Sequence, residues 1–134
     1  MTKDKNKKLD FDTVALSDDG RALVIIDQTL LPGEMKFIRL SEQRDIREAI
    51  YRLQVRGAPA IGVAAAIGIY LAALEISENV SEEDAFFEKL SEAKIYLQEA
   101  RPTAVNLRWA LDRMYDFALS KKGLGPEVIA AQMK

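Results

Sequence analysis

The sequence predicts an α+β fold, in which a small antiparallel sheet of two to three strands precedes a bundle of about four to five helices. Two observations lead to this prediction. Short β-branched runs bounded by turn residues lie within residues 11–40, whereas apolar residues at helical spacing, interrupted by Gly and Pro, follow them. Over 134 residues, 49% are hydrophobic and 30% are charged, which is the balance of a single globular domain.

The sheet is expected near the N-terminus. Leu23 to Ile26 is a β-branched run, and residues 35–40 form a second, alternating run. Residues 31–34, Leu-Pro-Gly-Glu, have turn chemistry, because Pro presets φ and Gly tolerates a positive φ. Together these segments predict an antiparallel hairpin. Residues 11–16 are expected to add a third strand, with Asp-Asp-Gly at 18–20 as its turn.

Helices are expected from about residue 41 onward. The second of them is apolar on all sides, and close helix packing is expected to offset the cost of Gly62 and Gly68, about 1 kcal/mol each relative to Ala. Every expected start carries a capping residue or a proline, namely Ser41, Pro59, Ser81 (the first residue of a Ser-Glu-Glu-Asp capping box), Thr103 and Pro126.

The third and fourth helices have recognisable apolar faces. Trp109, Tyr115 and Phe117 are more typical of a core than of a base-stacking surface, because no basic interleaving supports nucleic-acid binding. The positions expected to be buried are Phe86, Phe87, Leu90, Ile95 and Tyr96 in one helix and Leu107, Leu111, Met114 and Ala118 in the next.

The chain is expected to divide into a disordered tail over residues 1–10 and one domain over residues 11–134. The last helix, from about residue 126, has too few residues to be stable alone. We therefore expect it to be the truncated first part of something longer.

Composition excludes several classes of function. There is no Cys and no His, so disulfides, Cys-His zinc sites, a thiol nucleophile and an imidazole base are excluded within this chain. The net charge of -2 and the pI of 5.3 give no reason to expect nucleic acid. Residues 57–74 carry no charge, but Ala and Gly dominate them, which favours a buried helix over a membrane span. No secretory signal is recognisable, and the absence of Cys is compatible with the cytoplasm.

Two short segments place an arginine directly before a helix start. Residues 56–62 read Arg-Gly-Ala-Pro-Ala-Ile-Gly, and residues 101–107 read Arg-Pro-Thr-Ala-Val-Asn-Leu. The first amides of a helix lack backbone partners and attract anions, and a guanidinium can add bidentate contacts to phosphate. Gly57 leaves room for a ligand, and Asn106 could add a neutral hydrogen bond. On spacing alone, an exposed Arg followed by a helix cap is the favoured interpretation for both segments.

A third segment, Asp27-Gln28-Thr29, follows the first β-branched run. A general-base role for Asp27 has little support without a partner carboxylate or His, so a turn-stabilising role is favoured.

These three segments resemble, in order and at similar separations, the first three sequence blocks of methylthioribose-1-phosphate isomerases. The matching residues are 27–32, 56–62 and 101–107, and Asp112-Arg113-Met114 also fits. The wider superfamily includes ribose-1,5-bisphosphate isomerases and the regulatory subunits of translation initiation factor 2B. The second and third blocks look more like the methylthioribose branch.

The resemblance implies the N-terminal domain of an aldose–ketose isomerase of methionine salvage, which converts 5-methylthioribose 1-phosphate to 5-methylthioribulose 1-phosphate without metal or organic cofactor. It assigns substrate-phosphate binding to Arg56, Gly57, Ala58 and Arg101, which tips the two Arg segments toward an anion site. In the family, the catalytic Cys and Asp lie in a Rossmann-like C-terminal domain that is absent here. We therefore expect no catalytic residue in this chain and no activity from the chain alone.

The expected partners are a sugar phosphate and the missing C-terminal domain or a separate C-terminal polypeptide. A second copy in a homodimer is a further candidate. An uncovered apolar patch is expected where the missing domain would dock. The alternative is a non-catalytic interaction module related to the translation-factor subunits. Arg56 and Arg101 argue against this alternative, because a scaffold has little need for two arginines at helix starts.

Overall fold

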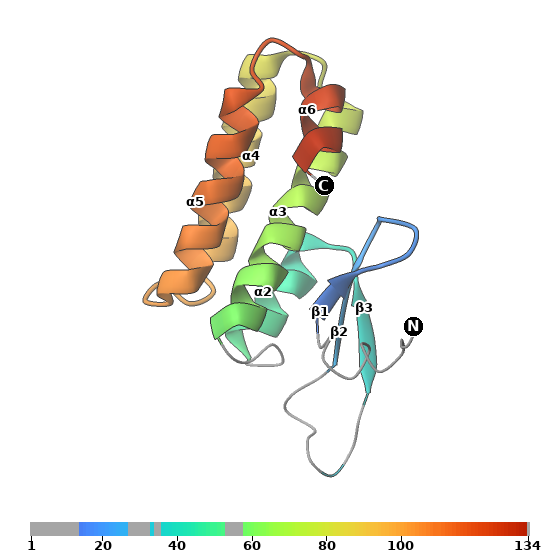
Figure 1. The fold of residues 1–134 in the computed structure, drawn as a ribbon, viewed down its shortest axis with the longest axis vertical. Helices are drawn as coiled ribbons and strands as arrows, with labels where there is room; N and C mark the ends of the chain where they lie inside the picture. The colour runs from blue at the N-terminus through green and yellow to red at the C-terminus, as the bar shows by residue number, and fades with distance from the viewer. Residues whose placement is uncertain (1–13, 27–32, 34–35, 53–57, 134) are drawn as a thin grey trace.

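The computed structural model describes residues 14–26, 33, 36–52 and 58–133. Within these residues, a three-stranded sheet is followed by five helices, as the sequence predicts (Figure 1). The expected tail, Asp27 to Thr29 and most of the expected turn at 31–34 lie outside the described residues. The elements are β1 (Val14–Leu16), β2 (Leu23–Ile26), β3 (Phe37–Leu40), α2 (Gln43–Tyr51), α3 (Ala58–Asn79), α4 (Glu83–Gln98), α5 (Val105–Ser120) and α6 (Pro126–Met133).

The sheet is antiparallel throughout, with the order β1-β2-β3. Val14 pairs with Ile25 and Ile38 pairs with the same Ile25 from the other side, so β2 is the central strand. Three of its four residues are buried, because a central strand with one face on the helices has little solvent contact. Gly20 has a φ of 71° in the turn between β1 and β2, where its lack of a side chain removes the strain of that conformation. The predicted hairpin and third strand are confirmed.

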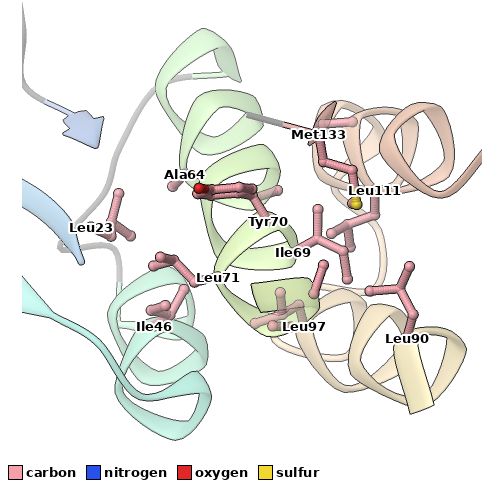
Figure 2. Close-up of a cluster of buried hydrophobic side chains, with 14 of the residues drawn as sticks. Leu23, Ile46, Ala64, Ile69, Tyr70, Leu71, Leu90, Leu97, Leu111 and Met133 are labelled. Atoms are coloured by element: carbon pink, nitrogen blue, oxygen red, sulfur yellow. The ribbon is translucent and has the colours of Figure 1, made fainter. Parts of the chain in front are cut away.

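Helix α3 is the centre of the fold, and every other helix contacts it (Figure 1). Its apolar side chains meet two groups of partners, one from the sheet and α2 and one from α4, α5 and α6 (Figure 2). By length and composition α3 would also suit a membrane span, but 56% of the qualifying segment is buried inside this bundle. A core helix surrounded by partners explains an apolar circumference without a membrane. The labelled partners are Leu23 and Ile46 on one side and Leu90, Leu97, Leu111 and Met133 on the other.

The two glycines of α3 differ in their surroundings. A β-carbon on Gly68 would lie 3.2 Å from Cγ2 of Ile46 and 3.3 Å from Cδ1 of Leu97, so α2 and α4 approach α3 closely there. The Gln43 side chain also donates a 2.9 Å hydrogen bond to the Gly68 carbonyl. A β-carbon on Gly62 would lie at 3.8 Å or more from its neighbours. Close packing therefore explains Gly68, as predicted, but it does not require a glycine at position 62.

The predicted helix caps are wrong by one residue in three places. Helices α2, α4 and α5 have Glu42, Glu82 and Ala104 at their N-cap positions, and none makes a side-chain capping hydrogen bond. The hydroxyls of Ser41, Ser81 and Thr103 precede those positions by one residue, too early to reach the second or third helical amide.

Two predictions of burial are also wrong. Ile95 is 52% exposed, and Leu97 takes its place in the core. Trp109 is 60% exposed and Phe117 is 39% exposed, although both were expected to be buried. Helix α5 presents them to the side that no described element covers. Of its expected stripe, Leu107, Leu111 and Ala118 are buried as predicted, and Met114 is half-buried.

Candidate functional site

The starts of α3 and α5 lie at the same end of the bundle (Figure 1). The two helices run side by side in the same direction, and a β-carbon on Gly62 would lie 3.8 Å from the backbone oxygen of Asn106 and 4.0 Å from Cβ of Ala110. Gly62 is the fifth residue of α3 and Asn106 is the second of α5. The positive ends of two helix dipoles are therefore neighbours.

Arg101 lies in the turn that leads from α4 into α5. Its amide donates to the Gln98 carbonyl over 3.3 Å, and its own carbonyl accepts from the Ala104 amide over 2.9 Å. These bonds fix the backbone, and the side chain is half-buried. In the part of the chain that the structure describes, no carboxylate lies within ion-pair distance of Arg101. Among the described residues, therefore, no carboxylate competes with an external anion for its guanidinium.

In the part of the chain that the structure describes, no acceptor pairs with the first backbone amides of α5. Ala104 occupies the N-cap position, and it has no side-chain oxygen that could accept from the amides of Asn106 or Leu107. An external anion can take the place of that missing acceptor. The Asn106 side chain is exposed beside these amides.

The other three predicted site residues are located only in part. Ala58 is the first residue of α3, so its backbone belongs to the cluster of helix starts, while its side chain lies outside the described residues. Arg56 and Gly57 directly precede it and fall within 53–57, also outside the description. The structure therefore brings together the Ala58 end of α3 and the Arg101 end of α5.

An open, mostly apolar groove of about 330 Å³ runs from this end along α3 and α5. Sequence reasoning missed it, although the spacing of Val105, Trp109 and Arg113 at intervals of four already places them on one side of a helix. The groove is lined by Gly62, Val63, Ala66, Asn106, Trp109, Ala110, Arg113 and Met114.

Arg21 and Arg39, elsewhere in the described region, are already paired with carboxylates. Arg21 forms a 2.9 Å ion pair with Glu78, near the opposite end of α3, and this contact lowers the pKa of Glu78 and raises that of Arg21. The Arg39 guanidinium lies 2.7 Å from Asp19. Hydrogen bonds from the Ser17 hydroxyl, the Arg39 guanidinium and the Arg21 amide hold the pKa of Asp19 well below its usual value. These arginines are poor candidates for a phosphate site, because a carboxylate already occupies each.

No group of three or more His, Cys, Asp or Glu side chains with the geometry of a metal site is found among the described residues. What the arrangement offers is anion binding by amides and guanidinium, next to an apolar groove.

Comparison with known proteins identifies the family of this chain. The sequence model described as "Initiation factor 2 subunit family" matches residues 54–127, more than half of the chain, and includes both Arg segments. The chain belongs to this family. It is 56% identical to methylthioribose-1-phosphate isomerase from Symbiobacterium thermophilum over 101 residues, which are 75% of this chain and 28% of the relative. It is 51% identical to 5-deoxyribose 1-phosphate isomerase from Petrotoga mobilis over 102 residues, again 75% and 28%.

Two solved structures share the fold. The 5-methylthioribose 1-phosphate isomerase from Pyrococcus horikoshii superposes with a TM-score of 0.80 at 33% identity, covering 90% of this chain and 33% of that one. The delta subunit of translation initiation factor eIF-2B from A. fulgidus gives 0.76 at 35% identity, covering 90% and 34%. The chain thus corresponds to the N-terminal domain of these proteins and spans about 28% of the curated relatives it matches.

Proposed function

We propose that this chain is the substrate-phosphate-binding part of an isomerase that converts 5-methylthioribose 1-phosphate to 5-methylthioribulose 1-phosphate in methionine salvage, in the cytoplasm. The observation that carries the proposal is the pairing of two helix starts, each preceded by an arginine, at one end of the bundle. Relatives named for isomerases of 5-methylthioribose and 5-deoxyribose 1-phosphates support this choice of substrate class.

The proposed role follows from the chemistry of the reaction. In the conversion, a hydrogen moves from C2 to C1 of the opened sugar, and the phosphate is attached to the oxygen at C1. Holding the phosphate therefore fixes the two reacting carbons relative to the groups that move the proton. The phosphate is bound by the backbone amides at the starts of α3 and α5 and by the guanidinium groups of Arg56 and Arg101.

The matched region is 28% of the S. thermophilum relative, and we place the groups that transfer the proton in the rest of that enzyme's length. We propose that the 134 residues alone do not catalyse the isomerisation.

A fusion protein tests the proposal. In it, residues 1–134 replace the matching part of the S. thermophilum relative, and the rest of that relative follows. We expect the fusion to convert 5-methylthioribose 1-phosphate and the isolated chain to have no activity above background. Turnover by the isolated chain would contradict the proposal that the 134 residues do not catalyse the isomerisation alone. A folded but inactive fusion would contradict the isomerase assignment.

A non-catalytic regulatory module is the second candidate, and the similarity to the eIF-2B delta subunit favours it. The two candidates differ in ligand. Binding of 5-methylthioribose 1-phosphate that is lost in Arg101→Ala supports the isomerase, whereas its absence in the folded fusion supports the regulatory module.

A further inference from the structure

Helix α5 presents a row of large apolar side chains to solvent. Val105 is 66% exposed, Trp109 is 60% exposed and Phe117 is 39% exposed. With Arg113 they are spaced by four residues, so they follow one side of the helix with a slow drift around it. A monomeric protein rarely leaves such a row uncovered, and rows of this kind mark interaction surfaces.

Trp109 and Arg113 of this row line one wall of the groove described above, and the side chains on the floor of the groove are small. Gly62, Ala66 and Ala110 line the floor, so an incoming element can approach the backbones of α3 and α5. Val63, 45% exposed, closes the groove on the α3 side. The Arg113 guanidinium lies 5.1 Å from the centre of the Trp109 ring and has no carboxylate within ion-pair distance among the described residues.

The groove begins at the phosphate end of the bundle. Gly62 is one turn into α3 and Asn106 is in the first turn of α5, so whatever fills the groove also stands beside the proposed phosphate site. The catalytic groups must reach that same place. The relatives carry about 70% of their length outside the region that this chain matches, and that length has to pack against some face of the domain.

We propose that the groove between α3 and α5 is the docking surface for the catalytic part of the isomerase. This inference rests on the proposed function and adds the place of contact. The complementary element brings apolar side chains to Val63 and Trp109 and a carboxylate to Arg113. A second copy of this chain is the less favoured occupant, because it would cover the groove without bringing catalytic groups to the phosphate end.

Trp109 reports on its own burial, because it is the one tryptophan of the chain. The experiment measures acrylamide quenching of its fluorescence in the isolated chain and in the fusion, after every tryptophan in the fused part has been replaced by Phe. Docking predicts a shift of emission to shorter wavelength and a several-fold fall in quenching in the fusion. The control carries Trp109→Phe and Ile95→Trp, since Ile95 is 52% exposed on α4 and away from the groove. This reporter is expected to stay equally quenchable in both proteins.

The outcomes separate the two proposals. An active fusion in which Trp109 stays as quenchable as in the isolated chain overturns the docking surface and leaves the function standing. A protected Trp109 in a folded fusion without isomerase activity supports the docking surface and overturns the function. Protection in the isolated chain that grows with concentration, together with dimers in sedimentation, assigns the groove to a second copy and overturns the proposal.

A second measurement does not depend on the fusion. Val63→Asp in the isolated chain is expected to leave the melting temperature nearly unchanged, because the side chain is exposed there. A loss comparable to that of Leu111→Ala, which empties a fully buried site, would mean that the groove belongs to the core of this domain and would overturn the proposal.

Discussion

The two ends of the helical bundle contain similar groups in opposite states. At the far end, the Glu83 carboxylate accepts hydrogen bonds of 2.7 to 2.9 Å from the amides of Gly123 and Gly125, and Glu78 holds Arg21. At the near end, α5 begins without a side-chain cap, and Arg101 has no carboxylate partner among the described residues. Amides and an arginine thus have partners at the far end, and they have none among the described residues at the near end, where we propose that phosphate binds.

The largest effect is expected from Arg101→Ala in the fusion protein. Loss of a charge-assisted contact to phosphate should lower kcat/KM for 5-methylthioribose 1-phosphate by roughly 10- to 100-fold. Steady-state kinetics measure this, with circular dichroism as a check on folding. The matched control is Arg21→Ala, which removes an arginine from the far end and is expected to leave kcat/KM within a factor of about two. Equal losses of kcat/KM in both variants would contradict the proposed difference between the two ends.

At the far end, Glu83→Ala should act on stability and leave phosphate binding unchanged. The substitution removes the acceptor from the Gly123 and Gly125 amides, which is expected to lower the free energy of unfolding by about 1–2 kcal/mol. Urea denaturation of the isolated chain measures it. Glu82→Ala is the control, because the neighbouring Glu82 side chain makes no capping hydrogen bond. A Glu83→Ala chain as stable as the control would show that the carboxylate is dispensable.

Alanine substitutions at the two glycines of α3 are expected to change the stability by smaller amounts and in opposite directions. Gly68→Ala places a methyl group 3.2 Å from Ile46, a β-branched side chain with little freedom to move, and should destabilise the chain by about 1 kcal/mol. Gly62→Ala meets no close contact, so the gain in helix propensity should stabilise it by about 0.5–1 kcal/mol. Thermal denaturation of both variants checks the signs. The same sign for both would show that the surroundings of the two positions do not differ as described.

The smallest expected effect concerns the pH dependence set by Asp19. Its folded pKa is lowered from the usual 3.8, so its contribution to stability is present above that pH and is lost as the pH falls through the folded pKa. Asp19→Asn should therefore reduce the loss of melting temperature on acidification below about pH 4. Asp18→Asn, at an exposed neighbour in the same turn, is expected to lose as much melting temperature on acidification as the parent chain. Identical acid profiles for all three proteins would contradict the role of Asp19.

The sequence predicted the order and type of the elements because those depend on local signals. β-branched runs mark β2, and Pro126 marks α6. The caps were misplaced because a helix can begin one residue after a favourable hydroxyl without using it, as at Thr103. The hydrogen bonds that the Gly123 and Gly125 amides donate to Glu83 span 40 and 42 residues, and no local pattern indicates them.

The candidate site followed from the two Arg segments, and the structure adds that the starts of α3 and α5 are neighbours. The exposure of Trp109 could not be predicted from the sequence. Apolar periodicity indicates that a helix face will be covered, but it does not identify the segment or the chain that covers it. Its position on the groove became visible only once α3 was placed beside α5.

The most direct test of the central claim is a titration of the isolated, isotope-labelled chain with 5-methylthioribose 1-phosphate, followed by the amide resonances in NMR. We expect saturable shifts at Asn106 and Leu107, at the start of α5, that disappear in Arg101→Ala. We expect no shift at Gly123 or Gly125, whose amides already donate to Glu83. Shifts at the glycine end, or none at the start of α5 at any concentration that saturates the fusion protein, would contradict it.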